Sequence, residues 1–118
     1  MKILITGGAG FLGLHLASYL HKKNCKLTLV DIQEFNKKEY GNNYELAICD
    51  VRDRSKLDKL IKGQNVIIHA AAALPLWKRE DIYTTNIDGT RNVLELAKKH
   101  KIKRVIYISS TAVYGIPQ

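Results

Sequence analysis

The chain has 118 residues, of which 46% are hydrophobic and 25% are charged. It is therefore long enough for one domain with a substantial core, and too apolar for a disordered protein. Its net charge of +8 raises the question of nucleic-acid binding. The basic clusters at residues 21–23 and 98–101 instead fall at expected helix ends, where cations complement the helix dipole, and no aromatic residues alternate with them. We expect a soluble domain that binds no nucleic acid.

The first element is an apolar run that leads into the glycine-rich segment TGGAGFLG at residues 6–13. Two patterns overlap there. Gly8, Gly10 and Gly13 fit G-x-G-x-x-G. Gly7, Gly10 and Gly13 fit a second pattern, T-G-x-x-G-x-x-G. Apolar residues after Gly10 recur at helical spacing, so the segment predicts a strand, a glycine turn and a helix. Such a turn presents the backbone N–H groups at the helix start to an anion, most simply a pyrophosphate.

A second apolar run, at residues 26–30, ends at Asp31. Its distance from Gly13 is close to that expected for the acid that accepts the ribose hydroxyls of a dinucleotide. Because a carboxylate there would repel a 2′-phosphate, we expect NAD as the cofactor, with NADP less favoured. Lys37 and Lys38 keep NADP open, since flexible cations nearby could meet a phosphate. The alternative for the whole segment is an ordinary glycine turn followed by a capping Asp.

The middle of the chain continues this alternation. Residues 32–43 are polar and leave room for about one helical turn, and the weakly apolar residues 44–48 predict a third strand near the sheet edge. Ser55 and Asp58 have the spacing of a capping box, and the helix that follows should end at Gly63.

Residues 65–69 are a continuous apolar run, typical of a strand covered on both faces. We expect residues 70–73, four alanines, to extend it. Small side chains at a strand end leave room for a bulky ligand across the backbone, and a tightly packed strand–helix junction is the equal alternative.

Residues 80–99 have helical periodicity. Gly89 inside this helix should cost about 1 kcal/mol relative to Ala, which indicates close backbone packing against the sheet. Residues 104–108 predict a fifth strand that delivers Ser109 and Ser110 at its carboxyl end.

Strands that alternate with helices at this spacing predict an α/β fold with right-handed crossovers, a doubly wound parallel sheet of Rossmann type. We expect five strands in the order 3-2-1-4-5, in one domain over residues 1–118. Ligands of such sheets bind beyond the carboxyl ends of the strands where the order reverses, here between strands one and four.

The cysteines and the apolar segments give no evidence of a metal site, a signal peptide or a membrane span. Cys25 and Cys49 have no C-x-x-C partner and no His at metal-ligand spacing, so we expect reduced thiols in a cytoplasmic protein and no metal site. Glycines and His15 interrupt the apolar N-terminus, which excludes a signal peptide. The most apolar window, residues 66–77, is too short to span a bilayer, so no membrane is expected as a partner.

Five segments then carry a family resemblance: TGGAGFLG at residues 6–13, DVRD at 50–53, HAAA at 69–72, NIDGTRNVLE at 86–95 and SSTAVYG at 109–115. They resemble the extended short-chain dehydrogenase/reductase family, in particular its NAD-dependent nucleotide-sugar epimerases and dehydratases. Because the segments occur in order over nearly the whole chain, they are more specific than the glycines alone.

The resemblance implies roles for individual residues. Phe11 and Leu12 would offer backbone N–H groups to the pyrophosphate, and Asp31 would hold the adenosine ribose. Asp50 and Val51 would contact the adenine, and small residues after the fourth strand would line the middle and nicotinamide side of NAD. The full expected cofactor-binding set is Gly7, Gly10, Phe11, Leu12, Gly13, Asp31, Asp50, Val51, Ala70, Ala71, Ala72, Asn86 and Ser109.

In that family a Tyr phenolate, assisted by a Lys four residues later, removes a sugar hydroxyl proton while hydride passes to NAD. Ser110 falls at the position of the catalytic Ser or Thr, which hydrogen-bonds the reacting oxygen. The matching Tyr-x-x-x-Lys would lie beyond Gln118. We therefore expect the N-terminal, NAD-binding portion of a nucleotide-sugar epimerase or dehydratase, inactive by itself, with a fifth-strand edge on which a homodimer could form.

Two alternatives remain open. One is the corresponding portion of a hydroxysteroid- or flavonoid-type alcohol dehydrogenase or reductase, whose N-terminal pattern is the same. The other is an NAD-sensing regulatory domain that has lost catalysis, against which the retained Ser110 argues mildly.

Overall fold

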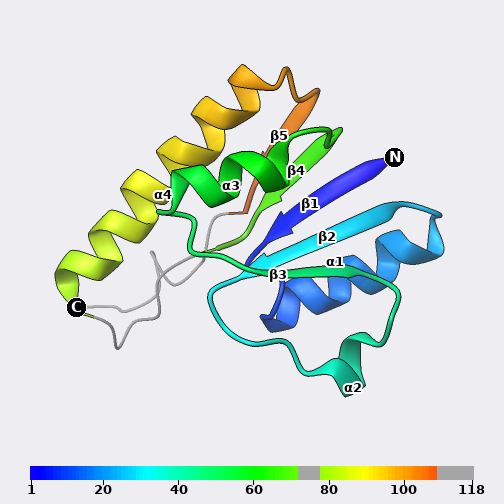
Figure 1. Cartoon of the computed structure of the whole chain (residues 1–118). Coiled ribbons are helices and arrows are strands. Elements are labelled where there is room, and N and C mark those ends of the chain that lie inside the picture. Colours follow the sequence, from blue (N-terminus) through cyan, green and yellow to red (C-terminus); the bar gives the residue numbers. More distant parts are fainter. Residues whose placement is uncertain (72–77, 109–118) are drawn as a thin grey trace, which may run out of the picture.

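The computed structural model describes residues 1–71 and 78–108, in which strands and helices alternate (Figure 1). The strands are β1 (Lys2–Thr6), β2 (Lys26–Asp31), β3 (Glu45–Ile48), β4 (Val66–His69) and β5 (Arg104–Tyr107). They form one parallel sheet in the order β3-β2-β1-β4-β5. The helices are α1 (Phe11–Lys22), α2 (Lys37–Tyr40), α3 (Arg54–Ile61) and α4 (Arg79–Lys99). The expected doubly wound Rossmann fold and its strand order are confirmed.

Each face of the sheet has its own hydrophobic core. On β1, Leu4 belongs to the core shared with α3 and α4, whereas Ile3 and Ile5 belong to the core shared with α1. Alternate strand residues point to opposite faces, so a strand covered on both sides must be apolar throughout. Figure 1 shows α1 on one side of the sheet and α3 with α4 on the other. The continuous apolar runs of β1 and β4 therefore follow from these two helical layers.

The capping residues expected for α3 were wrong. Asp53 caps α3, with its carboxylate accepting a hydrogen bond from the backbone N–H of Lys56 at 3.2 Å. Ser55 lies inside the helix, because Asp53 already satisfies the donor at the third helical position. Asp58 instead binds the side chains of Lys99 and His100, at 3.2 and 2.6 Å, and so joins α3 to the end of α4.

The strand β4 also ends earlier than expected. It stops at His69. Beyond it the backbone N–H groups of Ala70 and Ala71 both donate to the hydroxyl of Thr6 at 3.1 Å, and that of Ala70 also reaches the Thr6 carbonyl oxygen at 3.2 Å. On the neighbouring strand, β5 ends at Tyr107, one residue before the predicted end.

Gly89 does pack closely, but not against the sheet as we expected. A Cβ atom at this position would lie 2.5 Å from Cγ2 of Val51, which belongs to the loop between β3 and α3. The loop crosses α4 at this point and takes the place of the sheet.

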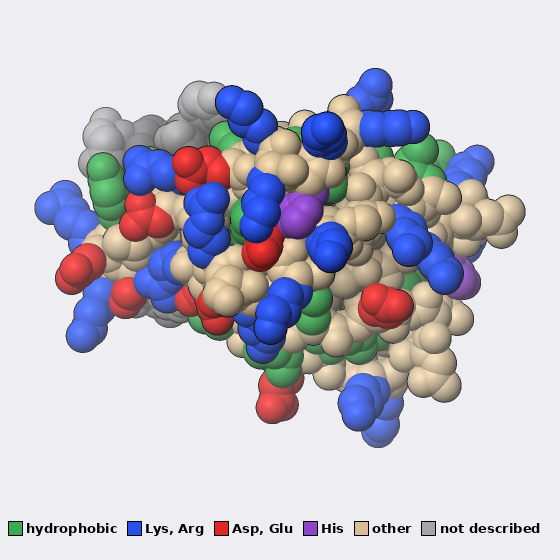
Figure 2. All heavy atoms as spheres, turned by 45° about the horizontal axis from the view of Figure 1, so that its top comes forward, with side chains coloured by type: hydrophobic (Ala, Val, Ile, Leu, Met, Phe, Trp, Pro, Cys, Tyr) green, Lys and Arg blue, Asp and Glu red, His purple; other side chains and the backbone are tan. Residues whose placement is uncertain are grey.

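Charged side chains are spread over the surface. Figure 2 shows Lys and Arg scattered across one face with Asp and Glu among them, rather than a single basic stripe. The two basic clusters lie where the sequence predicted, in and after the last turns of α1 and α4. Within residues 1–71 and 78–108, no helix is both long and apolar enough to cross a membrane.

Candidate functional site

The glycine turn between β1 and α1 forms the centre of the site. Gly7 has φ of 73°, in the left-handed region, and a Cβ there would lie 2.9 Å from the backbone of Ala70 and Ala71. A Cβ on Gly13 would lie 2.6 Å from the carbonyl oxygen of Gly7. Glycine is needed at both positions, because the turn folds back on itself and passes directly over the end of β4.

The first turn of α1 follows without a side-chain cap. Gly10 is the N-cap in an extended conformation, and the first turn holds no acidic residue. The first N–H groups of a helix have no partner among its own carbonyl groups, and this holds for those of Phe11 and Leu12. Such N–H groups, together with the positive end of the helix dipole, favour an anion.

Asp31, at the end of β2, lies against the glycine turn. Its Oδ2 accepts a hydrogen bond from the backbone N–H of Ala9 at 2.9 Å, and its Oδ1 accepts one from Gln33 at 3.0 Å. The spacing rule that singled out Asp31 thus identified a residue that touches the turn. The carboxylate helps to hold the turn in place as well as lying where a ribose is expected.

Tyr40, on α2, stabilises the glycine turn through a hydrogen bond. Its buried hydroxyl donates a hydrogen bond to the carbonyl oxygen of Gly8 at 2.7 Å. Burial, and next the nearby charge of Glu39, raise the pKa of Tyr40 above its usual value, so the hydroxyl keeps its proton at neutral pH. The short helix in the polar connection therefore supplies part of the frame of the site, a role that the sequence analysis missed.

A second polar cluster lies where β1 and β4 end side by side. Thr6 and His69 are paired in the sheet register, and the Thr6 hydroxyl lies 2.7 Å from Nδ1 of His69. The other ring nitrogen, Nε2, lies 3.1 Å from the hydroxyl of Thr90 on α4. His69 is only 1% exposed, and burial lowers its pKa to about 4. The ring is therefore neutral at physiological pH.

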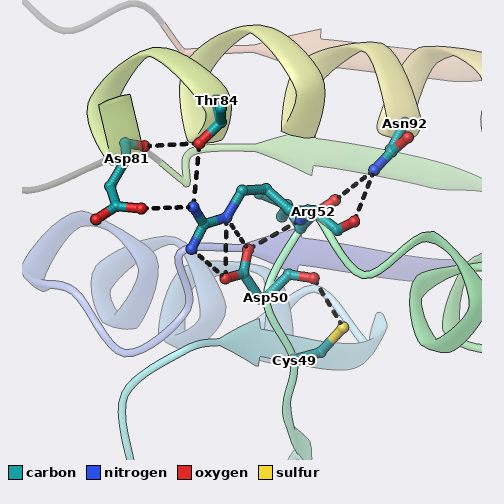
Figure 3. Close-up of polar contacts among 7 residues, drawn as sticks. Cys49, Asp50, Arg52, Asp81, Thr84 and Asn92 are labelled. Atoms are coloured by element: carbon teal, nitrogen blue, oxygen red, sulfur yellow. Dashed lines mark hydrogen bonds and ion pairs between the residues drawn. The ribbon is translucent and has the colours of Figure 1, made fainter. Parts of the chain in front are cut away.

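A third cluster centres on Arg52 in the loop after β3 (Figure 3). Its guanidinium binds both carboxylate oxygens of Asp50, with Nη2 2.7 Å from Oδ2. Nη1 reaches Asp81 and the hydroxyl of Thr84 on α4, each at 3.1 Å. Hydrogen bonding to Arg52 is the main reason that the pKa of Asp50 is lowered, and the same contact raises the pKa of Arg52. Arg52 therefore fixes the loop to the first turns of α4.

The same loop is held at a second point. The amide of Asn92 donates to the carbonyl oxygens of Val51 and Arg52, at 3.0 and 3.3 Å. The side chain of Val51 is buried against Gly89. The loop that we expected to contact adenine is thus held against α4 by the contacts of Arg52, Val51 and Asn92.

The structure places most of the predicted residues at or just after the carboxyl ends of the strands. Gly7 lies against Ala70 and Ala71 after β4, and Asp31 contacts the same glycine turn at Ala9. The loop with Asp50 and Val51 follows β3, the neighbour of β2. Asn86 lies on the exposed surface of α4 rather than at a strand end. Ala72, Ser109 and Ser110, the predicted catalytic residue among them, lie outside the described residues.

Several residues that shape the site had been given no role. They are Thr6, Tyr40, Arg52, His69 and Thr90. Their contacts join segments far apart in the sequence, including the contact between Thr6 and His69, which end two paired parallel strands.

Metal ligands are not gathered anywhere in the part of the chain that the structure describes: it holds no group of three or more His, Cys, Asp or Glu suited to a metal ion. Cys25 and Cys49 are free thiols, as expected.

Comparison with known proteins gives a consistent result. Residues 3–118 match the NAD dependent epimerase/dehydratase family. The chain is 38% identical to the UDP-N-acetyl-alpha-D-glucosaminuronate decarboxylase of Bacillus cytotoxicus, with 97% of the chain and 38% of that protein aligned. It is 34% identical to the uronate dehydrogenase of Pseudomonas syringae pv. tomato, aligned over 97% of the chain and 41% of that protein.

A solved structure shares the fold as well. The crystal structure of UDP-glucose 4-epimerase from Bifidobacterium longum in complex with NAD+ and UDP matches with a TM-score of 0.84 and 27% identity, over all of this chain and 39% of that one. The chain spans about two fifths of the length of these relatives. The glycine turn, the sheet order and the match over residues 3–118 lead to one conclusion: this chain belongs to the NAD-dependent epimerase/dehydratase family.

Proposed function

We propose that residues 1–118 form the NAD-binding portion of an epimerase/dehydratase-family enzyme that acts on a nucleotide sugar by transient hydride transfer. The observation that carries the proposal is the contact between the glycine turn and Asp31. In this contact the carboxylate of Asp31 lies beside the turn that leads into α1, next to β1, one of the two strands between which the sheet order reverses, and this supports the proposal.

The residues present fit a dinucleotide. Gly7 and Gly13 leave no space for a side chain, and the uncapped first turn of α1 offers N–H groups to a diphosphate. Asp31 supplies acceptors for ribose hydroxyls and a negative charge that disfavours a 2′-phosphate, so we propose NAD rather than NADP. Asp50 and Val51 would hold the adenine, and Ala70, Ala71, Ala72, Asn86 and Ser109 the remainder of the cofactor.

NAD, when bound, supplies a hydride acceptor. In the proposed reaction Ser110 hydrogen-bonds the reacting oxygen of the sugar. We propose that the 118-residue chain by itself binds NAD weakly and does not turn over a substrate. We also propose that two copies associate through the edge strand β5.

The relatives guide the choice of substrate. The named proteins include a decarboxylase of a UDP-sugar acid, a uronate dehydrogenase and a UDP-glucose 4-epimerase. All three names refer to sugars or sugar acids, which supports a sugar substrate over a steroid or flavonoid alcohol. A loss of catalysis with retention of NAD binding would make the protein a sensor instead, and turnover by the full-length protein would exclude that.

Titration calorimetry with NAD and NADP tests the cofactor proposal. We expect NAD to bind more tightly, and Asp31→Asn to reduce this preference by about tenfold, the effect of one nearby charge. Glu34→Gln is the matched control, since it removes one exposed negative charge from the same loop and should leave the preference unchanged. Absence of NAD binding at millimolar concentration, or equal binding of both cofactors, would contradict the proposal.

A further inference from the structure

The polar cluster between β1, β4 and α4 has a defined direction. The Thr6 hydroxyl accepts hydrogen bonds from the backbone N–H groups of Ala70 and Ala71, each at 3.1 Å. A hydroxyl has one proton and two lone pairs, and both lone pairs face these two amides, of which that of Ala70 is shared with the carbonyl oxygen of Thr6 at 3.2 Å. Its proton must therefore point to Nδ1 of His69, 2.7 Å away. Nδ1 is then the acceptor of the ring.

This assignment fixes the tautomer of His69. With Nδ1 accepting, the single ring proton of the neutral imidazole lies on Nε2, which donates to the hydroxyl of Thr90 at 3.1 Å. All hydrogen bonds in the cluster run in one direction, from the alanine amides through Thr6 and His69 to Thr90. Hydrogen bonds arranged in this way strengthen one another, and each depends on the next.

We propose that His69 is a positioning residue for the dinucleotide, because it holds the Thr6 hydroxyl in the orientation that pins Ala70 and Ala71 against the glycine turn. The proposal rests on the proposed NAD function. The position that is held matters because the backbone of Ala70 lies only 2.9 Å from where a Cβ of Gly7 would be. The two strands whose ends face each other there, β1 and β4, are those between which the sheet order reverses.

The link to Thr90 adds a second constraint. Thr90 lies on α4 one turn after Asn86, which we expect on the nicotinamide side of the cofactor. His69 thus connects the end of β4 to α4. The end of β4 lies between the expected adenosine and nicotinamide sides of the site. Thr6 and His69 are almost completely buried, so solvent does not compete for these hydrogen bonds.

Two substitutions separate the two links of the ring. His69→Asn places an amide oxygen near the position of Nδ1 and keeps an acceptor for Thr6, while it loses the bond to Thr90. His69→Gln places an amide nitrogen near the position of Nε2 and keeps a donor for Thr90, while it loses the acceptor for Thr6. If His69 only fills space in the core, both variants should lose stability and NAD affinity in proportion.

The experiment uses the 118-residue chain and three measurements on each variant: NAD affinity by calorimetry, thermal unfolding, and NMR of the Ala70 and Ala71 amides. In the wild-type chain, the imidazole ¹⁵N shifts should show a proton on Nε2 and none on Nδ1. We expect His69→Gln to raise the Kd for NAD about tenfold more than His69→Asn does, and to move both alanine amide signals upfield. Thr85→Val is the control, because the buried hydroxyl of Thr85 has no hydrogen-bond partner among the described residues.

The outcomes are distinct. A proton on Nδ1, or equal effects of the Asn and Gln variants on the alanine amides, would overturn the proposal. Losses of NAD affinity that simply follow the losses in Tm would also overturn it. If the wild-type chain fails to bind NAD, the proposed function fails, while the imidazole and amide signals still decide whether His69 positions the end of β4.

Discussion

The contact between Gly89 and Val51 gives a prediction that can be worked out from the structure. Gly89 lies inside α4, where replacement by Ala should stabilise an unobstructed helix by about 1 kcal/mol. Here the new Cβ would lie 2.5 Å from Cγ2 and 3.3 Å from Cβ of Val51. Val51 is β-branched and 4% exposed, and its carbonyl is held by Asn92 at 3.0 Å. Its methyl group therefore cannot move aside freely.

Overpacking of this kind costs about 1–3 kcal/mol, which exceeds the gain in helix propensity. We expect Gly89→Ala to lower the free energy of unfolding by about 1 kcal/mol. In a Val51→Ala background the obstructing Cγ2 is absent and the 3.3 Å contact to Cβ remains, so the gain in helix propensity is partly offset and the same change should leave the free energy of unfolding about unchanged. The double-mutant cycle should then show a coupling energy of about 1 kcal/mol.

Urea unfolding followed by far-UV circular dichroism measures all four variants, and an unchanged m-value shows that the unfolding transitions are comparable. The reasoning is refuted if Gly89→Ala has the same effect in both backgrounds. That result would mean that the loop after β3 moves away at no cost, and that it is not fixed against α4.

Three further predictions concern the other clusters. Arg52→Lys should lower the free energy of unfolding by about 1 kcal/mol in urea titrations, because an ammonium cannot reproduce the forked contacts of the guanidinium, and the side chain is 31% exposed; unchanged stability would contradict this. Because the pKa of His69 is about 4 when folded and 6.5 ordinarily, the unfolded chain binds the proton more readily, and stability should fall by about 3 kcal/mol as the pH is lowered from 7 to 4. The His69→Asn variant should show a flatter dependence in the same denaturation series. Gly7→Ala should lower the free energy of unfolding by about 3 kcal/mol in thermal unfolding, since it combines positive φ with a clash against Ala70. Gly41→Ala, with φ of 60° and open space around it, should lower it by about 1 kcal/mol, and equal losses would contradict the clash.

The sequence was sufficient to predict the sheet because its signals are local and repeated. Each strand covered on both faces needs a continuous apolar run, and each helix between two strands needs one apolar face. The short connection after Asp31 left room for only one helical turn, and α2 has that length. The weakly apolar third strand lies at the edge, where one side of β3 pairs with no other described strand.

The errors arose where two local solutions were both possible. Asp53 and Ser55 are each good N-cap residues, and the choice between them depends on where Asp58 is needed. Asp58 binds the end of α4, a contact between residues far apart in the sequence. The packing of Gly89 likewise depends on the path of the loop after β3. No periodicity in the helix itself contains that information.

The clusters around Arg52 and His69 were beyond sequence reasoning for a related reason. Arg52 lies within a segment that was singled out, DVRD, yet its partners on α4 are 29 and 32 positions away. The partner of His69 on β1 is 63 positions away. Such contacts follow from the strand register and the crossover helices, so they become predictable only after the fold is known.

Asp31 shows how one residue can serve both the fold and the proposed site. A carboxylate has about four lone-pair sites for hydrogen bonds. The backbone N–H groups of Ala9 and Gln33 use two of them, one on each oxygen. Two sites remain, which is the number that the two hydroxyls of an adenosine ribose require. An amide at this position has acceptor sites on one oxygen only, so it could not satisfy both the turn and a diol. If the proposed ribose contact holds, the acid at the end of β2 is needed for its second oxygen as much as for its charge.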